Sequence, residues 1–237
     1  MKKTILTFLL FSVSSLIADT TQDILTNSLE TMGSLKTYKI EATSENLLIY
    51  DKKIRSKYTN KFSMLVDRPY KATIKIIGDT KNRAYYFNKG SYTLYNQEDV
   101  IYWGDLVVPK ETDKALDFIL NKYGEEQPVS ILLYSDMMNR VQPNSITDFG
   151  IVMKNEKECN YIGFRSKDNK KDIHVWISTK SNLVVAYSII RKSALNEYRI
   201  NIDIKWTLDP KVNDKDFIFA NKIKGQKIPI NIKKTRK

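Results

Sequence analysis

Residues 198–206 carry the alternation that most constrains what this chain can fold into. Every second side chain there is large and apolar, and the side chains between are polar or charged. Successive side chains of a β-strand point to opposite faces, so a strand at this position has one apolar face and one solvated face. An apolar sheet face must be covered, either by other elements of the protein or by a ligand. The apolar set is Tyr198, Ile200, Ile202, Ile204 and Trp206.

The same two-residue period recurs along most of the chain. It is clearest in residues 54–66 and 71–76, and shorter segments between residues 83 and 191 repeat it, separated by turn-forming residues. Alternating segments joined by short turns are typical of antiparallel strands. The sequence therefore predicts a mainly β (α+β) fold built on one curved antiparallel sheet.

Three segments have helical spacing instead. Residues 20–32 form an amphipathic pattern that Gly33 can end, and residues 111–123 form another that Gly124 can end. A third helix is expected to begin at Pro128 and to run to residue 134. The two mid-chain helices interrupt the run of strands, so they are the natural lid for the apolar face.

The N-terminus has the pattern of a secretory signal. Two lysines precede an apolar run over residues 5–17 that is too short to span a bilayer. Residues 1–18 are therefore expected to be a signal peptide cleaved after Ala18, with an uncleaved anchor as the alternative. Export through such a signal predicts a periplasmic protein. The remainder, residues 19–237, is expected to form a single domain whose basic tail is loose from about residue 222.

The chain is strongly basic. It has 39 Lys and Arg against 27 Asp and Glu, and a formal net charge of +12. Positive charge favours acidic partners, and export argues against nucleic acid, so an anionic membrane surface or an envelope protein is the expected partner class. A basic surface that is simply solvated is the alternative.

The sequence contains no recognisable catalytic motif. The single cysteine, Cys159, allows no internal disulfide, and together with the single histidine, His174, it cannot supply a typical zinc site. No metal or cofactor is expected. The adjacent Glu125 and Glu126 are interpreted as a solvated loop. A hydrolase whose carboxylates meet only in the folded protein remains a third hypothesis.

Several loose motifs, in order, resemble an uncharacterised family of predicted periplasmic proteins related to the bacterial outer-membrane lipoprotein carriers. The resemblance implies an unclosed β-barrel with a helical lid over a hydrophobic cavity that shelters acyl chains. Members of the family often have a histidine after the cysteine, where this chain has Asn160, so no Cys–His function carries over. The motifs are YYFNKGSYTLY (85–95), PVSILLYSD (128–136), ECNYIGFR (158–165), HVWI (174–177), WTLDP (206–210) and FIF (217–219).

These observations favour a non-catalytic carrier or chaperone that binds a lipid, a lipoprotein acyl chain or another hydrophobic ligand between sheet and lid. The alternative is a structural or interaction scaffold whose core is filled by its own side chains. The residues expected to line the cavity are Tyr58, Phe62, Met64, Ile74, Ile76, Tyr86, Tyr102, Ile200, Ile202 and Ile204 on the sheet, and Phe118, Ile119, Leu132 and Leu133 on the lid.

Overall fold

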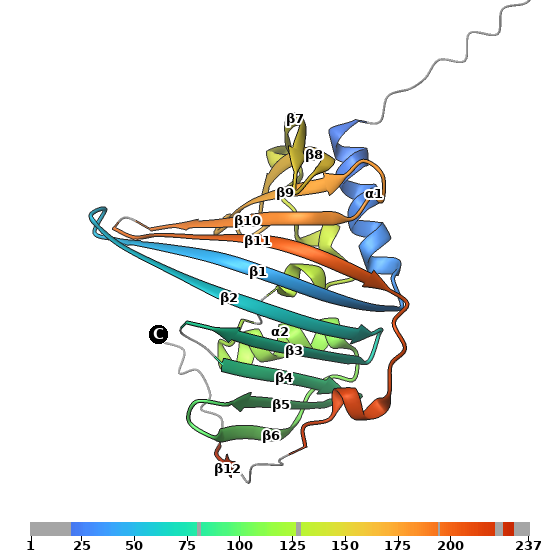
Figure 1. Ribbon diagram of the computed structural model, residues 1–237, viewed down its shortest axis with the longest axis vertical. Helices are drawn as coiled ribbons and strands as arrows, with labels where there is room; N and C mark the ends of the chain where they lie inside the picture. Colours follow the sequence, from blue (N-terminus) through green and yellow to red (C-terminus); the bar gives the residue numbers. More distant parts are fainter. Residues whose placement is uncertain (1–19, 80–81, 127–128, 194, 221–224, 230–237) are drawn as a thin grey trace, which may run out of the picture.

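One continuous twelve-stranded sheet dominates the computed structural model, which describes residues 20–79, 82–126, 129–193, 195–220 and 225–229 (Figure 1). The strand order is β12-β6-β5-β4-β3-β2-β1-β11-β10-β9-β8-β7, so the sheet does not close on itself. Its curved, unclosed antiparallel form confirms the predicted fold class. The strands are β1 (Thr37–Tyr50), β2 (Ile54–Asp67), β3 (Lys71–Gly78), β4 (Asn82–Asn88), β5 (Ser91–Asn96), β6 (Ile101–Val107), β7 (Thr147–Lys154), β8 (Lys157–Arg165), β9 (Asp172–Ser178), β10 (Val184–Lys192), β11 (Glu197–Leu208) and β12 (Gln226–Lys227).

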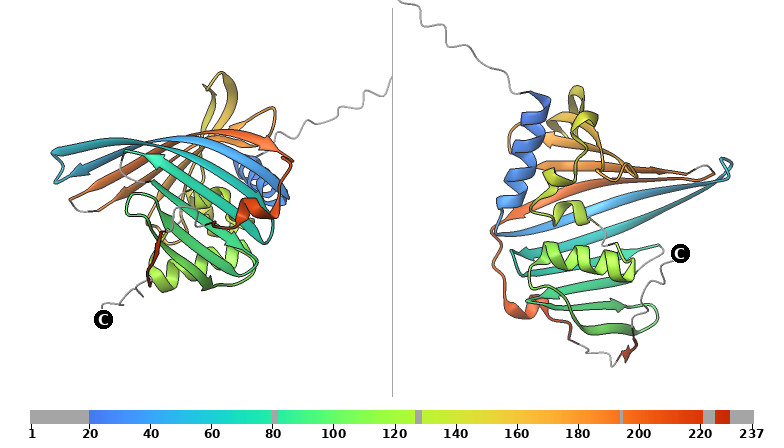
Figure 2. Two further views of the ribbon diagram at one scale, coloured as in Figure 1. Left: turned by 60° about the horizontal axis from the view of Figure 1, so that its bottom comes forward. Right: turned by 180° about the vertical axis from the view of Figure 1, so that it is seen from behind.

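The first and last long strands meet in the middle of the sheet. β11, which contains the alternating segment, lies between β1 and β10 and pairs antiparallel with both. Its register places Ile204 opposite Ala42 and Ile202 opposite Ser44 of β1. Cross-strand partners share a face, so these residues point to the side that we call the inner face, on which the helices lie (Figure 2).

Helix α1 (Thr21–Ser34) begins with a capping box between Thr20 and Asp23. It runs past the predicted end at Gly33, which lies inside the last turn. A Cβ atom on Gly33 would sit 2.5 Å from the carbonyl oxygen of Ser135. Glycine is therefore required there because another backbone approaches closely, and it does not end the helix.

The lid contains one α-helix. Helix α2 (Thr112–Tyr123) ends as predicted at Gly124, whose backbone is left-handed. The prediction of a second lid α-helix over residues 128–134 is wrong: the described part of that segment holds only a short 3₁₀ turn, η1 (Ser130–Leu132). Val129 has a left-handed φ of 56°, which prevents helical propagation into the turn. Two further 3₁₀ turns follow, η2 (Met137–Arg140) and η3 (Pro143–Ser145).

The lid is tied to the sheet by buried polar contacts. The hydroxyl of the fully buried Tyr38 donates to the carbonyl oxygen of Leu132 at 2.7 Å and accepts from Nη2 of Arg68 at 3.1 Å. The guanidinium of Arg68 also lies 3.7 Å from the carboxylate of Asp113 in α2. These contacts hold α2 and η1 over β1 and β2.

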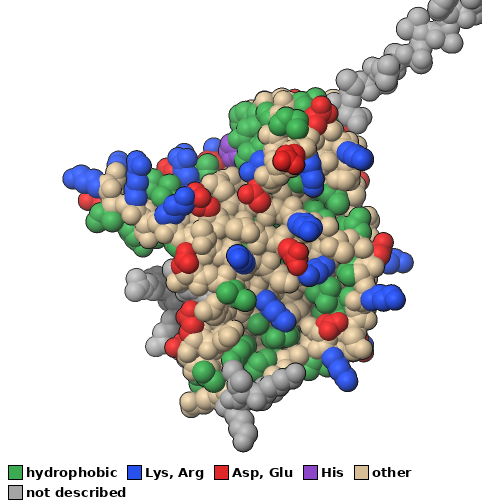
Figure 3. Space-filling view, viewed as in Figure 1, with side chains coloured by type: hydrophobic (Ala, Val, Ile, Leu, Met, Phe, Trp, Pro, Cys, Tyr) green, Lys and Arg blue, Asp and Glu red, His purple; other side chains and the backbone are tan. Residues whose placement is uncertain are grey.

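The C-terminal segment covers part of the outer face of the sheet. After η4 (Asp214–Phe217), the ring of Phe219 packs against Tyr86, Tyr95 and Tyr102, with centroid distances of 5.7, 5.0 and 5.0 Å. Within the tail that was expected to be loose, β12 pairs parallel with β6. The outer face carries Lys and Arg side chains interspersed with Asp and Glu side chains, and several Lys and Arg gather on the arm at the upper left, where the β1–β2 and β10–β11 hairpins project (Figure 3).

Candidate functional site

The inner face is filled at one end and open at the other. Next to α1 and α2, Met64, Ile74, Ile119, Leu132 and Leu133 are all almost completely buried in one continuous hydrophobic core. Two adjoining cavities remain on this face, one over β1 and β2 toward their hairpin and one between α2, η2 and the β8–β9 turn. We call them the sheet cavity and the lid cavity; Glu126, Ser130, Ile131 and Ile189 line both.

The sheet cavity has a volume of about 330 Å³. Tyr58, Phe62, Ile76, Ile200 and Ile202, all predicted from sequence, lie in its wall. The remaining wall is unexpectedly polar. It consists of Asn46, Asn60, Arg83, Tyr85, Glu125, Val129, Tyr187, Arg191 and Tyr198.

The polar floor of this cavity arises from a change in the inward positions of β1. Tyr38, Ile40 and Ala42 are followed at the same spacing by Ser44 and Asn46, both buried. The amide of Asn46 donates to the Ser44 hydroxyl at 2.8 Å. Two neighbouring side chains complete the network: Tyr198 donates to Asn46 Oδ1 at 2.9 Å, and Asn60 donates to Ser44 Oγ at 3.4 Å.

Two tyrosines of this floor stay neutral over a wide pH range. Burial raises the pKa of Tyr187, and the nearby Glu126 carboxylate raises it further. Burial also raises the pKa of Tyr198, and the adjacent Tyr58 hydroxyl raises it further. Both phenols therefore stay protonated at neutral pH; Tyr198 donates a hydrogen bond to Asn46, whereas the Tyr187 hydroxyl has no partner among the described residues.

Glu126 lies where the two cavities join. Its carboxylate bonds to Nζ of Lys171 at 2.5 Å and to Nη2 of Arg191 at 2.7 Å. Burial raises the pKa of Glu126, but the hydrogen bonds and charges of these two cations outweigh burial and leave the pKa below its usual value. The prediction of a solvated acidic loop is therefore wrong for Glu126. The adjacent Glu125 is also engaged, because it lies 3.5 Å from Arg83.

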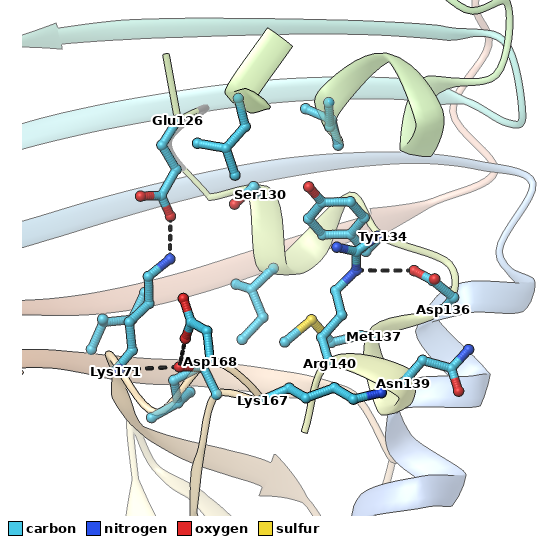
Figure 4. A pocket seen from close by; sticks show the side chains of 16 residues that line it. Glu126, Ser130, Tyr134, Asp136, Met137, Asn139, Arg140, Lys167, Asp168 and Lys171 are labelled. Carbon is cyan, nitrogen blue, oxygen red and sulfur yellow. Dashed lines mark hydrogen bonds and ion pairs between the residues drawn. The ribbon is translucent and has the colours of Figure 1, made fainter. Parts of the chain in front are cut away.

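The lid cavity is larger, at about 450 Å³, and more apolar (Figure 4). Charged groups stand at its rim. Arg140 stacks on the Tyr134 ring at 3.5 Å and binds the carboxylates of Asp117 and Asp136 at 3.0 and 3.2 Å. This cluster fixes η2 against α2. Apolar lining comes from Leu116, Leu120, Ile131, Met137, Ile173 and Ile189.

The remaining predicted cavity residues lie outside both cavities. Tyr86 and Tyr102 are on the outer face against Phe219, because Ile74 pairs with Tyr85 and the following residue must point the other way. Phe118 is half-buried beside the core, and Ile204 is buried.

Sequence reasoning missed Asn46, Asn60, Tyr187, Arg191 and Glu126, all of which line the sheet cavity. The polar residues Ser44 and Asn46 interrupt the apolar alternation of β1, and Asn60 interrupts that of β2, so the sequence held a signal for both asparagines. Tyr187 and Arg191 reach the cavity through the pairing of β10 with β11, which the sequence does not show. Glu126 is held there by its ion pairs with Lys171 and Arg191.

The single cysteine and the single histidine lie apart on the sheet. Cys159 pairs with Ser178, whereas His174 pairs with Gly163, four residues further along β8. Burial raises the pKa of the Cys159 thiol, and the His174 ring is hydrogen-bonded to the Tyr161 hydroxyl at 2.8 Å. Within the described residues, no group of three or more His, Cys, Asp or Glu side chains is arranged to hold a metal ion. No α-helix in the described part of the chain has the length and apolar character to cross a bilayer.

The model of one protein family, described as "Predicted periplasmic protein (DUF2092)", matches residues 21–231. This match confirms the family and the periplasmic location that the sequence indicated. No curated protein matches the chain significantly.

Solved structures of similar fold include three that cover most of the chain. They are a LolA superfamily protein from Nitrosomonas europaea (10% identity, TM-score 0.38, covering 85% of this chain and 99% of that one), an uncharacterized conserved protein from Thermus thermophilus (8%, 0.49, 88% and 98%) and a putative outer membrane lipoprotein-sorting protein domain from Vibrio parahaemolyticus (10%, 0.37, 83% and 95%).

Proposed function

We propose that this protein, which belongs to the predicted periplasmic family matched over residues 21–231, is a non-catalytic carrier for a lipid or a lipid-modified protein. The acyl chain of the cargo would occupy the space between sheet and lid. The observation that carries this proposal is the lid cavity, whose wall combines aliphatic side chains and Met137 with a rim of polar and charged groups, and which the protein leaves unfilled.

The volumes suit such a ligand. Ligand sites in proteins typically measure about 300–1,000 Å³ and are mainly apolar with a few polar groups. The lid cavity and the sheet cavity, at about 450 and 330 Å³, each fall in this range. Because Ile131 and Ile189 line both, one elongated ligand could lie across the junction.

Release would require the lid to move. At its inner end the lid is held by buried bonds between Tyr38, Arg68 and Leu132. Near the cavity junction it is held by the partly exposed ion pairs of Glu126. Exposed pairs are weak, so opening is expected at the Glu126 end, where bulk water competes for the charges. The basic surface would favour contact with anionic membranes during exchange.

A scaffold role is the second candidate, favoured by the filled end of the core. It would use the sheet as a platform for an envelope protein. The edge strand β7 exposes Phe149, Ile151 and Met153, with 46%, 64% and 69% of their surfaces accessible. Crosslinking in cells would yield a stable protein partner if this role is correct.

Native mass spectrometry of protein purified from its own periplasm tests the carrier proposal. A co-purifying lipid mass and displacement of a fluorescent acyl probe by lipid are expected. Protein that carries no lipid and binds no acyl probe would contradict the proposal.

A matched pair of variants sharpens this test. Ile131→Phe adds a ring at the junction of both cavities and should weaken probe binding by about tenfold, through steric occlusion. Ile77→Phe makes the same change at a position on the outer face that is 63% exposed, and should leave probe binding unchanged.

A further inference from the structure

The sheet cavity contains buried polar atoms without partners. Among the described residues, the hydroxyl of Tyr187, Oδ1 of Asn60 and Nε of Arg191 are buried without a hydrogen bond. All three side chains line the same cavity. Folded proteins pair the great majority of such groups, and these three atoms offer two donors and one acceptor that no described protein group has taken.

Tyr187 is the most confined of the three. Its side chain is only 1% exposed, and in β10 it lies opposite Ile202 of β11. Its phenol stays protonated, since burial and the neighbouring carboxylate both disfavour the charged form. It is therefore a neutral donor whose hydroxyl no described protein acceptor has taken.

The charges around the cavity are already paired. Arg83 lies beside Glu125 at 3.5 Å, and Arg191 binds Glu126 at 2.7 Å. Within the described lining, two cations thus face two anions. A free carboxylate or phosphate would meet Glu125 and Glu126 without an uncommitted cation to receive it. A neutral polar group fits this balance better than an ion.

We propose that the sheet cavity binds the neutral acyl carbonyl of an ester or amide, with the attached alkyl chain passing Ile131 and Ile189 into the lid cavity. This inference rests on the carrier function proposed above and names the chemical class of the cargo. The Tyr187 hydroxyl donates to the carbonyl oxygen, and Arg191 Nε is the second donor. Asn60 Oδ1 accepts from the hydroxyl or amide N–H next to the carbonyl.

Competitors with one twelve-carbon chain and different head groups test the proposal on the full protein. Each displaces a fluorescent acyl probe at pH 7.5. The neutral carbonyl compounds are 1-monododecanoylglycerol and N-methyldodecanamide, and the comparison compounds are dodecanoate and dodecane. The neutral carbonyl compounds should bind about 3- to 10-fold more tightly than either comparison compound, the range expected for one or two hydrogen bonds. A preference for the ester would indicate a glycerolipid, and a preference for the amide an N-acylated protein.

Two tyrosine variants show whether the Tyr187 hydroxyl is responsible. Tyr187→Phe should weaken both carbonyl compounds about 3- to 10-fold and leave dodecane unchanged. Tyr95→Phe is the matched control, because its hydroxyl is also buried and without a partner but its ring packs on Phe219 at the outer face. It should change none of the affinities. Each variant loses only one oxygen atom, and thermal unfolding followed by circular dichroism verifies that both fold.

The results that would overturn this inference differ from those that would overturn the carrier function. Equal affinities for dodecane and the carbonyl compounds, or no effect of Tyr187→Phe, would overturn this inference while leaving the carrier function intact. Tightest binding of dodecanoate would also overturn it, because the site would then select an anion. If no compound displaces the probe and the probe itself does not bind, both the inference and the carrier function fail.

Discussion

Replacing Tyr38 by phenylalanine should release the inner end of the lid. The hydroxyl of this fully buried side chain has two partners, the carbonyl oxygen of Leu132 and the guanidinium of Arg68. Without it, the Leu132 carbonyl loses its bond to the sheet, which costs about 1–3 kcal/mol when the group stays buried. The Arg68 guanidinium still has the Asp113 carboxylate at 3.7 Å, so losing the Tyr38 hydroxyl costs Arg68 less free energy than it costs the Leu132 carbonyl.

The expected decrease in the free energy of unfolding is about 2–3 kcal/mol, after allowing for the easier burial of phenylalanine. Domains of this kind are stable by only about 5–15 kcal/mol, so the change is large. Urea unfolding followed by tryptophan fluorescence measures it. With an m-value of about 2–3 kcal/mol/M, the midpoint should fall by about 1 M.

Tyr187→Phe is the matched control for this measurement. The two rings are equally buried, but the Tyr187 hydroxyl has no partner in the folded chain. Its removal should change the free energy of unfolding by less than about 0.5 kcal/mol or stabilise the protein slightly. If both variants unfold at the same urea concentration, the tether between Tyr38 and the lid does not contribute as argued.

Two further predictions concern pH and packing. Burial raises the pKa of Tyr38 and of Tyr85 to about 12 from 10.0, so their contribution to stability is complete below pH 10 and is lost as the pH rises toward 12. The urea midpoint should be constant from pH 8 to 9.5 and fall between pH 10 and 11, and a flat profile up to pH 11 would contradict this. Gly33→Ala should destabilise the protein by about 1–3 kcal/mol although alanine favours helices, because its Cβ would meet the Ser135 carbonyl oxygen at 2.5 Å. Thermal unfolding checks this against Glu30→Ala on the exposed side of α1, which should be nearly neutral.

The strands and helices in which apolar side chains recur at a regular spacing were predictable from the sequence. The alternation in residues 198–206 and 54–66 placed two of the long strands, and Gly124 marked the end of α2. These signals are local, since side-chain periodicity and left-handed glycine depend only on neighbouring residues. The 3₁₀ turn at Ser130 was missed because the backbone at Val129 is left-handed, and no glycine or asparagine marks that position in the sequence.

The candidate site was predictable only in part. Tyr58, Phe62 and Ile202, which were predicted from the two-residue period of their strands, lie in the wall of the sheet cavity. Tyr86 and Tyr102 belong to short strands in an aromatic region, where both faces carry aromatic rings and the pattern does not tell inside from outside. A shift of one residue in the assumed inward positions of a strand moves every side chain of that strand to the opposite face of the sheet, so the whole strand is then misassigned.

The sequence by itself determined that this protein has an extended antiparallel sheet with one apolar face, an exported location and a helical cover. It did so because side-chain alternation and a signal-like N-terminus are local properties of the chain. Only the tertiary structure decided which part of the apolar face is filled, and it brought Asn60, Tyr187 and Arg191 to one cavity from β2 and β10. Those strands are separated by more than a hundred residues in sequence, and their side chains meet only because β1 and β11 pair between them.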